Sequence, residues 1–595
     1  MFLRRNRKVV DGEAYDYWTL CESTRTAQGP RQRVVASLGK LDSQETSHGW
    51  EDIDALLEGH SRPRQLQFGQ SDPPEQQVEL VDIHGVRVER SREFGSVYLG
   101  LALWRRLGLH TLLGELIESG RESVPWEAVA SILSIGRFCA QTSELSIAQE
   151  WYERTALEDL LAIDPMQIND DRLYRGLDVL IKHRDKLCGH LMERYKDWFG
   201  VNMEFLIYDV TSTFFEGQCE RNPNAARGYS RDNRSDCKQV CIGLVCSAEG
   251  LPLSYEVFKG NRSDVTTVES IVRQMEDKYG KAQRIWVMDR GMVSEKNIEF
   301  LRQRGARYIV GTPKSQLRHF EAELLSGQDW REVNEGVEAR LVEHPDGNGA
   351  EKYVLCRSSA RRMKEAAMLE RQTQALAEKL AAMDRGLRRS PQNDVEKVGR
   401  RIGRYLGKYP AAARVIEAVV IREEQGAICG LNYWSRVETG KRAGMAQGAY
   451  LLRTNCTEED PAKIWQWYMQ LTQAEAAFRT AKSDIGLRPI FHQLADRVES
   501  HILVCFLSLA MWRTLEMWMA SKGLGNCARK LVSEVGTIRS MDVILPVLRG
   551  KQRIEMRLRV VEKPEKRVAE LLAHLGLQLP SRSKILQNVV EKMTR

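Results

Sequence analysis

The spacing of apolar residues changes several times along the chain and divides it into segments. Residues 1–45 alternate in short runs, AYDYWTLCES and QRVVASLG around a polar turn, which predicts a small β-hairpin module. Residues 46–80 are polar and rich in Gln, Pro and Ser, so we expect a linker there. The segment VELVDIHGVRVERSREFG returns to strand-like alternation, and from Ser96 to about Phe199 apolar positions recur every three or four residues, so residues 81–200 are predicted to form a mainly helical domain.

The pattern becomes strand-like over residues 201–315. The apolar run in EFLIYDV ends on Asp209, and the run in RIWVMD ends on Asp289, as expected of strands buried on both faces. Two strand-like runs and a helix lie between them, and a helix and a further strand follow. This order of strand, two strands, helix, strand, helix, strand predicts a mixed α/β sheet, and it is the order of a ribonuclease-H-like fold.

An interruption follows at residues 316–455, where strand-like runs surround a helical segment. We interpret it as a β-rich insertion with a basic helical segment, Arg357 to Lys408, which holds 14 Lys or Arg against 6 Asp or Glu. Its excess of positive charge is larger than the +7 of the whole chain. A solvated helix face and a surface that contacts phosphate both fit this charge.

The core pattern resumes at residues 456–500, and residues 501–595 are expected to form a helical C-terminal region. The stretch from Trp465 to His492 predicts a helix, because no Gly or Pro interrupts it before Gly486. Five residues of this helix are spaced 3, 4, 4 and 3 positions apart and would share one face: Tyr468, Leu471, Glu475, Arg479 and Lys482. Taken alone, Glu475 and Arg479 are best explained as a surface ion pair.

Composition narrows the class of protein. The length of 595 residues suggests about three to four domains, and the net charge of +7 is compatible with a nucleic-acid partner. The twelve cysteines are scattered and show no zinc-ligand spacing, so reduced thiols in a cytoplasmic protein are expected. The N-terminus lacks a signal-peptide core, and the apolar helix His501 to Ala520 contains Arg513 and Glu516, which favours a core helix over a membrane span.

The two strand-end aspartates change the interpretation of Glu475. Sites of α/β sheets lie at the carboxyl ends of their strands, and three carboxylates that converge there cannot all be ionised without a cation. Oxygen ligands favour Mg²⁺ or Mn²⁺. Two such ions, roughly 3.5–4 Å apart, would activate a water or a 3′-hydroxyl for in-line phosphoryl transfer. Asp209 would bridge both ions, and Asp289 and Glu475 would each bind one.

Three motifs carry a resemblance to a known family. They are YDVTSTFFEG around Asp209, VMDRGMVS around Asp289, and a Y-x2-R-x3-E-x6-K signature that runs from Tyr468 to Lys482. Over about residues 204–492 the chain resembles a DDE transposase of a bacterial insertion sequence, in the IS-four-like superfamily and its long-chain branch with a YDVTT-type first motif. One position departs from the signature, because Leu471 stands where the family has Arg.

The resemblance implies roles for the neighbouring residues. The family has a β-rich insertion between its second Asp and its Glu, and the gap of 186 residues from Asp289 to Glu475 fits that. Tyr468 and Lys482 would contact donor phosphates, and Arg290 would support Asp289. Arg479 could substitute for the Arg missing at Leu471.

The resemblance also implies an activity. The chain would bind the terminal inverted repeats of its element, cleave these DNA ends with two Mg²⁺ or Mn²⁺ ions, and join the 3′ ends to target DNA as a homodimer in the bacterial cytoplasm, without a membrane partner. The helical domain at residues 81–200 would recognise DNA, although plain helical packing gives the same pattern. The alternatives are a catalytically inactive or domesticated DNA-binding regulator, and a nuclease that cuts without strand transfer.

Several other polar and aromatic residues have a structural explanation. Loop carboxylates are usually caps or solvated, which applies to Glu216, Asp232, Asp236 and Asp264. Thr211 and Thr213 could hydrogen-bond around Asp209. Trp434, Trp465 and Trp467 could stack on a flipped base, but tryptophan is more often a core residue. We find no glycine-rich phosphate loop and expect no nucleotide hydrolysis.

Overall fold

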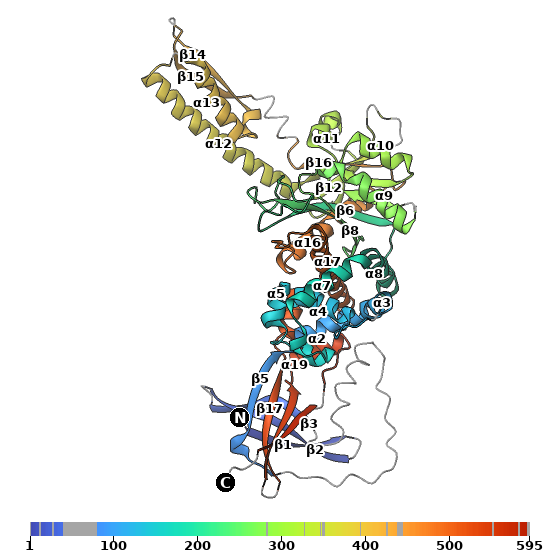
Figure 1. The fold of residues 1–595 in the computed structure, drawn as a ribbon. Helices are drawn as coiled ribbons and strands as arrows, with labels where there is room; N and C mark the ends of the chain where they lie inside the picture. The colour runs from blue at the N-terminus through green and yellow to red at the C-terminus, as the bar shows by residue number, and fades with distance from the viewer. Residues whose placement is uncertain are drawn as a thin grey trace. The chain divides into compact units, whose positions relative to one another are not determined.

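The computed structural model describes residues 2–10, 13–26, 29–39 and 80–591, apart from short internal gaps. The gaps are residues 119, 281–283, 327, 345–346, 348–350, 393, 424–425, 437–443, 445, 550–551 and 581–583. Nearly all of the linker predicted at residues 46–80 lies outside the described residues. Figure 1 shows the order of the elements along the chain.

The chain forms two compact units, and each contains segments that are distant in sequence. The first unit comprises residues 1–202, 210–262 and 473–595, and the second comprises residues 203–209 and 263–472. Strand β6 (Phe205–Phe214) therefore begins in the second unit and ends in the first.

The first unit starts with three antiparallel strands, β1 (Phe2–Val10), β2 (Glu13–Thr26) and β3 (Gly29–Gly39). Its helical part begins at Gly95. The longer helices there are α2 (Gly95–Arg106), α3 (Leu109–Leu116), α4 (Trp126–Ala140), α7 (Asp170–Leu180) and α8 (Arg184–Phe199).

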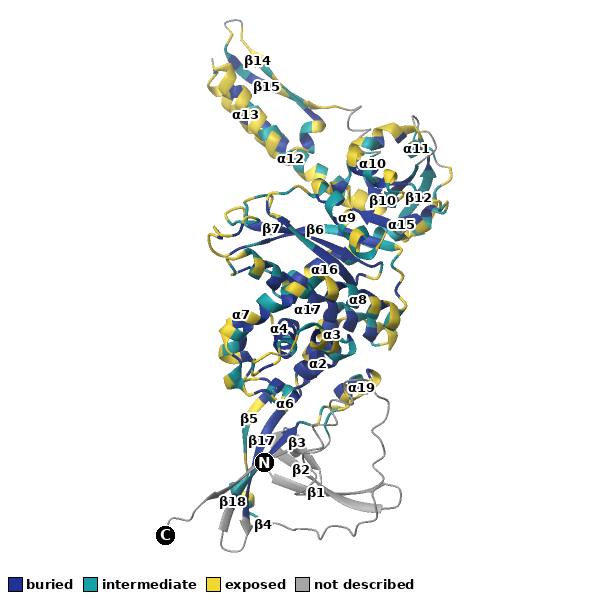
Figure 2. Ribbon diagram, turned by 45° about the vertical axis from the view of Figure 1, so that its right-hand side comes forward, coloured by how far each residue is buried: buried dark blue, intermediate teal, exposed yellow. Residues whose placement is uncertain are grey.

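Helix α17 (Ala495–Ser521) lies at the centre of this helical part. It packs against α2, α4 and α7, and Figure 2 shows it largely buried. By length and composition it could cross a membrane, but 89% of its most apolar window is buried inside the fold. A helix that is apolar on all sides is stable in water only when other elements cover it, so α17 is the core helix that the sequence predicts.

The C-terminal region contains strands, so the prediction of a helical region over residues 501–595 is wrong beyond α18 (Ala528–Val535). Strands β17 (Arg539–Arg549), β18 (Gln552–Val561) and β19 (Lys584–Glu591) form a sheet with β4 (Leu80–Val81) and β5 (Arg87–Glu93), and α19 (Lys566–His574) lies between β18 and β19 in the chain. The physical reason is the period of QRIEMRLRVV, in which every second residue is apolar.

A nine-stranded mixed sheet positions the candidate site, and its strand order is β11-β12-β13-β16-β10-β9-β6-β7-β8. After β6 the chain forms β7 (Gln239–Cys246), β8 (Pro252–Lys259), α9 (Val268–Tyr279), β9 (Ile285–Met288), α10 (Glu295–Gln303) and β10 (Arg307–Gly311). This is the predicted order of strand, two strands, helix, strand, helix and strand. Strands β6, β9 and β10 run parallel to one another.

The segment between the second aspartate and Glu475 has two parts. Strands β11 (Arg331–Asn334), β12 (Val337–Val342), β13 (Lys352–Ser358) and β16 (Ala449–Thr454) extend the sheet beyond β10. The remainder, which we call the arm, consists of α12 (Ser359–Arg389), α13 (Val395–Lys408), β14 (Ile416–Arg422) and β15 (Ile428–Ser435). Residues 316–455 thus contain strands on both sides of the helical segment, but four of the strands belong to the main sheet and two belong to the arm.

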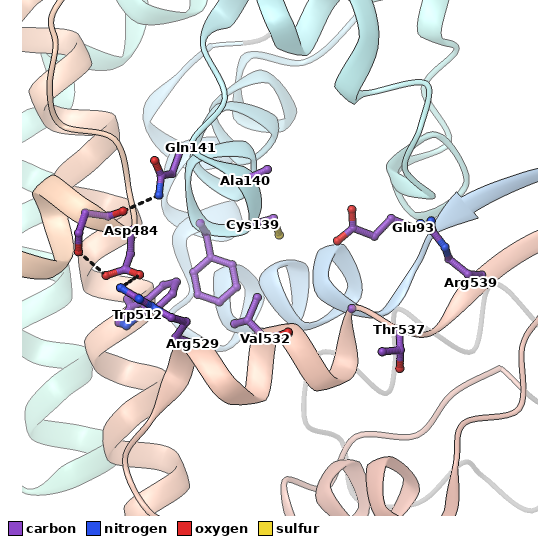
Figure 3. A pocket seen from close by; sticks show the side chains of 14 residues that line it. Glu93, Cys139, Ala140, Gln141, Asp484, Trp512, Arg529, Val532, Thr537 and Arg539 are labelled. Atoms are coloured by element: carbon purple, nitrogen blue, oxygen red, sulfur yellow. Dashed lines mark hydrogen bonds and ion pairs between the residues drawn. The ribbon is translucent and has the colours of Figure 1, made fainter.

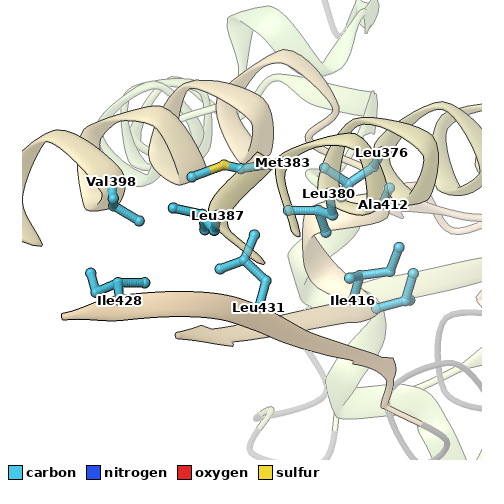
Figure 4. Packing of buried hydrophobic residues seen from close by; sticks show 10 residues of the cluster. Leu376, Leu380, Met383, Leu387, Val398, Ala412, Ile416, Ile428 and Leu431 are labelled. Carbon is cyan, nitrogen blue, oxygen red and sulfur yellow. The ribbon is translucent and has the colours of Figure 1, made fainter. Parts of the chain in front are cut away.

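The arm has a hydrophobic core of its own (Figure 4). Leu376, Leu380, Met383 and Leu387 are spaced 4, 3 and 4 residues apart on α12 and form one buried face. This face covers the antiparallel pair β14–β15, and Val398 of α13 joins the same cluster. Two helices packed on a hairpin can thus bury enough apolar surface to stand as a separate module.

Candidate functional site

Asp209 and Asp289 lie side by side in the second unit. Strands β6 and β9 are parallel, and their register pairs Tyr208 with Met288. The next residues are Asp209 and Asp289, so the two carboxylates lie level on neighbouring strands, whose backbones are about 4.8 Å apart. Asp209 is half-buried and Asp289 is exposed. The structure therefore brings together the two aspartates that the sequence places at strand ends.

Asp289 lies in the loop directly after β9. A short 3₁₀ helix, η6 (Arg290–Met292), follows directly, and Asp289 stands at its N-cap position but makes no side-chain capping hydrogen bond. Asn297 stabilises this loop, because its side-chain amide donates hydrogen bonds to the carbonyls of Met292 at 2.9 Å and Val265 at 2.7 Å. Arg290 is exposed at the start of η6.

Tyr468 reaches the same end of the sheet from α15 (Pro461–Met469). Val310 of β10 pairs with Met288, so Gly311 lies level with Asp289 on its other side. A Cβ atom added at Gly311 would lie 2.4 Å from the Tyr468 hydroxyl oxygen, which shows that the phenol occupies the room left by this glycine. Burial raises the pKa of Tyr468, and the nearby charge of Asp289 raises it further, so the phenol is a neutral hydrogen-bond donor.

The predicted single helix around Glu475 is two helices. α15 ends at Met469, and α16 (Leu471–Ser483) begins after one turn residue, Gln470. Tyr468 thus belongs to α15, whereas the other four predicted residues keep their spacing on α16, where Leu471 is buried and Glu475 and Arg479 are exposed. Burial at position 471 gives a physical reason why a leucine stands there. Glu475 belongs to the first unit, and its convergence with the two aspartates stays a prediction.

Lys482 is held by an ion pair within the first unit. Its ammonium lies 2.9 Å from a carboxylate oxygen of Asp232, which also accepts a hydrogen bond from Arg488. The side chains of Lys482 and Asp232 are only 11% and 3% exposed. Burial lowers the pKa of Lys482, and the hydrogen bond that its ammonium donates to Asp232 opposes that effect. Asp232 is therefore not the solvated loop carboxylate that we expected. The two residues are 250 positions apart, and no sequence signal connects them.

The remaining loop carboxylates agree better with expectation. Asp236 and Glu216 form ion pairs with Arg234, at 3.0 and 3.5 Å, and all three side chains are at least 37% exposed. Asp264 begins a short 3₁₀ helix, η5 (Asp264–Thr266), that precedes α9. The hydroxyl of Thr213 donates to the carbonyl of Leu487 at 3.1 Å.

The three tryptophans differ in burial. Trp465 is 7% exposed and donates to the Tyr450 hydroxyl at 2.6 Å, and Trp467 contacts the Phe205 ring at a centroid distance of 4.8 Å. Both belong to the packing of the second unit. Trp434, on β15 of the arm, is 42% exposed.

Glu144, His492 and His501 form a cluster with metal-ligand chemistry in the first unit, because their ligand atoms lie within 4.8 Å of one another. The guanidinium of Arg137 occupies this cluster. One of its nitrogens lies 3.2 Å from Nδ1 of His501 and 3.6 Å from the Glu144 carboxylate. A fixed positive charge at this position opposes a metal ion, so the cluster is best described as a buried ion-pair network.

A pocket of about 850 Å³ also opens in the first unit (Figure 3). The end of α4 lines it, together with the residues after Lys482 and helices α17 and α18. Two polar contacts lie in its wall: Arg529 forms an ion pair with Asp484 at 2.5 Å, and the Gln141 amide donates to the Ser483 carbonyl at 2.5 Å. None of the site residues predicted from the sequence lines this pocket.

Comparisons with known proteins show the family of this chain. Residues 202–511, more than half of the chain, match the family described as transposase DDE domain. Residues 3–72 match the N-terminal domain of IS1634 family transposases. Among solved structures, a cryo-EM structure of the piggyBac transposase synaptic complex with hairpin DNA is similar at 11% identity and a TM-score of 0.34, over 72% of this chain and 75% of that chain. No curated protein matches. The chain thus belongs to the DDE transposases of insertion sequences, a family that generally uses divalent metal ions.

Proposed function

We propose that this transposase binds the terminal inverted repeats of its insertion sequence, cleaves the DNA ends and joins the 3′ ends to target DNA. The catalytic residues would be Asp209, Asp289 and Glu475, on a ribonuclease-H-like core. The observation that carries the proposal is the register of β6 and β9, which sets the two aspartates level at neighbouring strand ends. One chain supplies one set of these three carboxylates, so the coordinated cutting of two DNA ends favours a homodimer. This homodimer would act in the bacterial cytoplasm.

The two aspartates fit a divalent cation. Like charges on neighbouring strands oppose each other's ionisation unless a cation compensates them, and Asp289 is not engaged in capping η6. Their oxygen ligands suit Mg²⁺ or Mn²⁺, with Glu475 as the third carboxylate. When bound, two such ions would supply activation of the attacking hydroxyl and stabilisation of the leaving oxygen.

The neighbouring side chains would bind and orient the DNA. The neutral phenol of Tyr468, beside Asp289, would donate a hydrogen bond to a phosphate oxygen at the scissile position. Arg290 and Arg479 are exposed cations that would contact the backbone, and Arg479 would act in place of the arginine that the buried Leu471 replaces. Lys482 would contact phosphate only in competition with Asp232.

The test is a strand-cleavage and joining assay on duplexes that carry the element's ends, with Mg²⁺. Asp209→Asn, Asp289→Asn and Glu475→Gln keep the size of each side chain and should each lower cleavage by more than about 10³-fold, as loss of a catalytic group does. Asp236→Asn is the matched control, since this exposed carboxylate accepts hydrogen bonds from Arg234 and Cys237. Full cleavage by any of the three variants would exclude that residue from the site.

The same assay separates the other functions. A DNA-binding regulator would bind end DNA and never nick it, and a nuclease would nick the DNA without forming joined products. Recovery of joined products from the unmodified chain, and their loss in all three variants, is the result that supports a transposase with this triad.

A further inference from the structure

Helix α13 of the arm carries a dense stripe of positive charge. Its 14 residues include five basic side chains and one acidic side chain, Glu396. We call the five the basic stripe; they are Lys397, Arg400, Arg401, Arg404 and Lys408, and all are exposed. The opposite face packs into the arm, where Val398 is buried and Ile402, Tyr405 and Leu406 lie against the same core. The core thus fixes which face of α13 is turned to solvent.

Few of these charges are compensated within the protein. Across the part of the arm that the structure describes, Lys397, Arg404 and Lys408 have no carboxylate oxygen within 4.0 Å of their charged nitrogens. Arg400 lies 3.8 Å from Glu396, and Arg401 donates to the Tyr405 hydroxyl. Like charges four residues apart destabilise a helix, and α13 contains three such pairs. A polyanion alongside the helix would turn this repulsion into attraction.

Three glycines run beside the basic stripe, at positions 399, 403 and 407. A Cβ atom added at any of them would have no heavy atom within 4 Å, so packing does not require a glycine there. Glycine in a helix interior is destabilising relative to alanine, yet each of the three directly precedes a residue of the stripe. Absence of a side chain lets another molecule's backbone approach the helix closely.

We propose that the basic stripe of α13 binds the sugar-phosphate backbone of duplex DNA, outside the catalytic site and without regard to sequence. A helix of this length is about 21 Å long and can lie beside roughly a dozen phosphates of the two strands. The choice of DNA rests on the proposed function, but the contact itself needs neither the triad nor a metal ion. The arm therefore adds a second anchoring surface for the DNA.

The test measures binding of the full chain to a duplex that lacks the element's end sequence, in EDTA, as a function of NaCl concentration. Changing Lys397, Arg404 and Lys408 together to glutamine should reduce the slope of log affinity against log salt by about 2.7, or about 0.9 for each lost phosphate contact. The matched control exchanges the same three residues between lysine and arginine, which keeps the charge and should keep the slope. EDTA prevents cleavage, so a failure of the catalytic proposal does not affect this result.

An unchanged slope in the glutamine variant would overturn the proposal. The proposal would also be overturned if the glutamine variant lost binding to an acidic polypeptide but kept binding to DNA, because the stripe would then bind a protein partner. Circular dichroism checks that the glutamine variant is folded. The unmodified chain gives a second measurement: chemical acetylation of Lys397 and Lys408, followed by mass spectrometry, should decrease when duplex DNA is added. Equal acetylation with and without duplex contradicts the proposal.

The glycines provide an independent variant. Gly403→Ala with Gly407→Ala should raise the melting temperature, because alanine favours a helix, and should lower the affinity for DNA several-fold through loss of the close approach. A more stable variant that binds weakly cannot be explained by misfolding. A variant that is more stable and binds DNA as tightly as the unmodified chain would refute the close approach.

Discussion

Replacing Lys482 tests whether this lysine stabilises the fold, contacts DNA, or does both. Lys482→Met removes an ammonium from the Asp232 carboxylate, whose side chain is 3% exposed. The second carboxylate oxygen of Asp232 is buried and has no hydrogen-bond partner among the described residues. The carboxylate would keep Arg488, whose side chain is 36% exposed and whose charge is therefore partly screened by water.

The expected cost follows from that geometry. Removing one partner of a buried ion pair costs about 3–5 kcal/mol. Because Arg488 still contacts the same oxygen, we expect the lower end, about 3 kcal/mol of unfolding free energy. Asp232→Asn combined with Lys482→Met removes both charges and should recover most of the loss, about 2 kcal/mol.

Urea unfolding of the full chain, followed by circular dichroism, measures these differences. Arg479→Met is the matched control, because this exposed cation lies on the same helix and should change stability by less than about 0.5 kcal/mol. A Lys482→Met variant as stable as the unmodified chain would refute a structural role of the pair. If the double variant is stable but its salt slope for end DNA falls by about one, Lys482 also contacts phosphate.

Three further outcomes follow from packing and charge. Gly311→Ala places a methyl group 2.4 Å from the Tyr468 hydroxyl oxygen, and overpacking of this kind costs about 1–3 kcal/mol. The rate of single-turnover DNA cleavage should therefore fall, and adding Tyr468→Phe should restore part of it. An unchanged cleavage rate in Gly311→Ala would show that the phenol moves freely. Burial and Arg137 lower the pKa of His501 from 6.5 to about 3, so between these two pH values the unfolded chain binds more protons than the folded chain. The free energy of unfolding should therefore fall by about 3 kcal/mol from neutral pH to about pH 4.5. His501→Gln should remove this pH dependence; a variant that keeps the full pH dependence would show that His501 is not its cause. Leu380→Ala leaves a cavity in the arm at a cost of about 2–5 kcal/mol and should raise hydrogen exchange over α12; unchanged exchange would mean that this core does not hold the arm together.

Some elements were predictable because their cause is local. The apolar runs before Asp209 and Asp289 require buried strands, and a carboxylate directly after each run marks the strand end. The order of strands and helices through β10 followed from the same periodicity. The C-terminal strands β17 and β18 contradict the predicted helical region, although the alternation in QRIEMRLRVV is typical of a strand.

Other features depend on contacts that no local pattern encodes. The pair of Lys482 with Asp232 joins residues 250 positions apart. The room that Gly311 leaves for Tyr468 depends on how α15 packs beside β10. The break at Gln470 separates Tyr468 from the four residues on α16, and packing buries Leu471 at the start of that helix.

By itself, the sequence determined the secondary structure around the two aspartates and the family motifs, because buried strands and helix faces impose their period on neighbouring residues. Only the tertiary structure decided that β6 and β9 pair in the register that sets Asp209 beside Asp289. It also decided that Lys482 is neutralised by Asp232 and that α13 turns five cations to solvent. Register, ion pairing and the choice of exposed face depend on segments that meet only after the chain has folded.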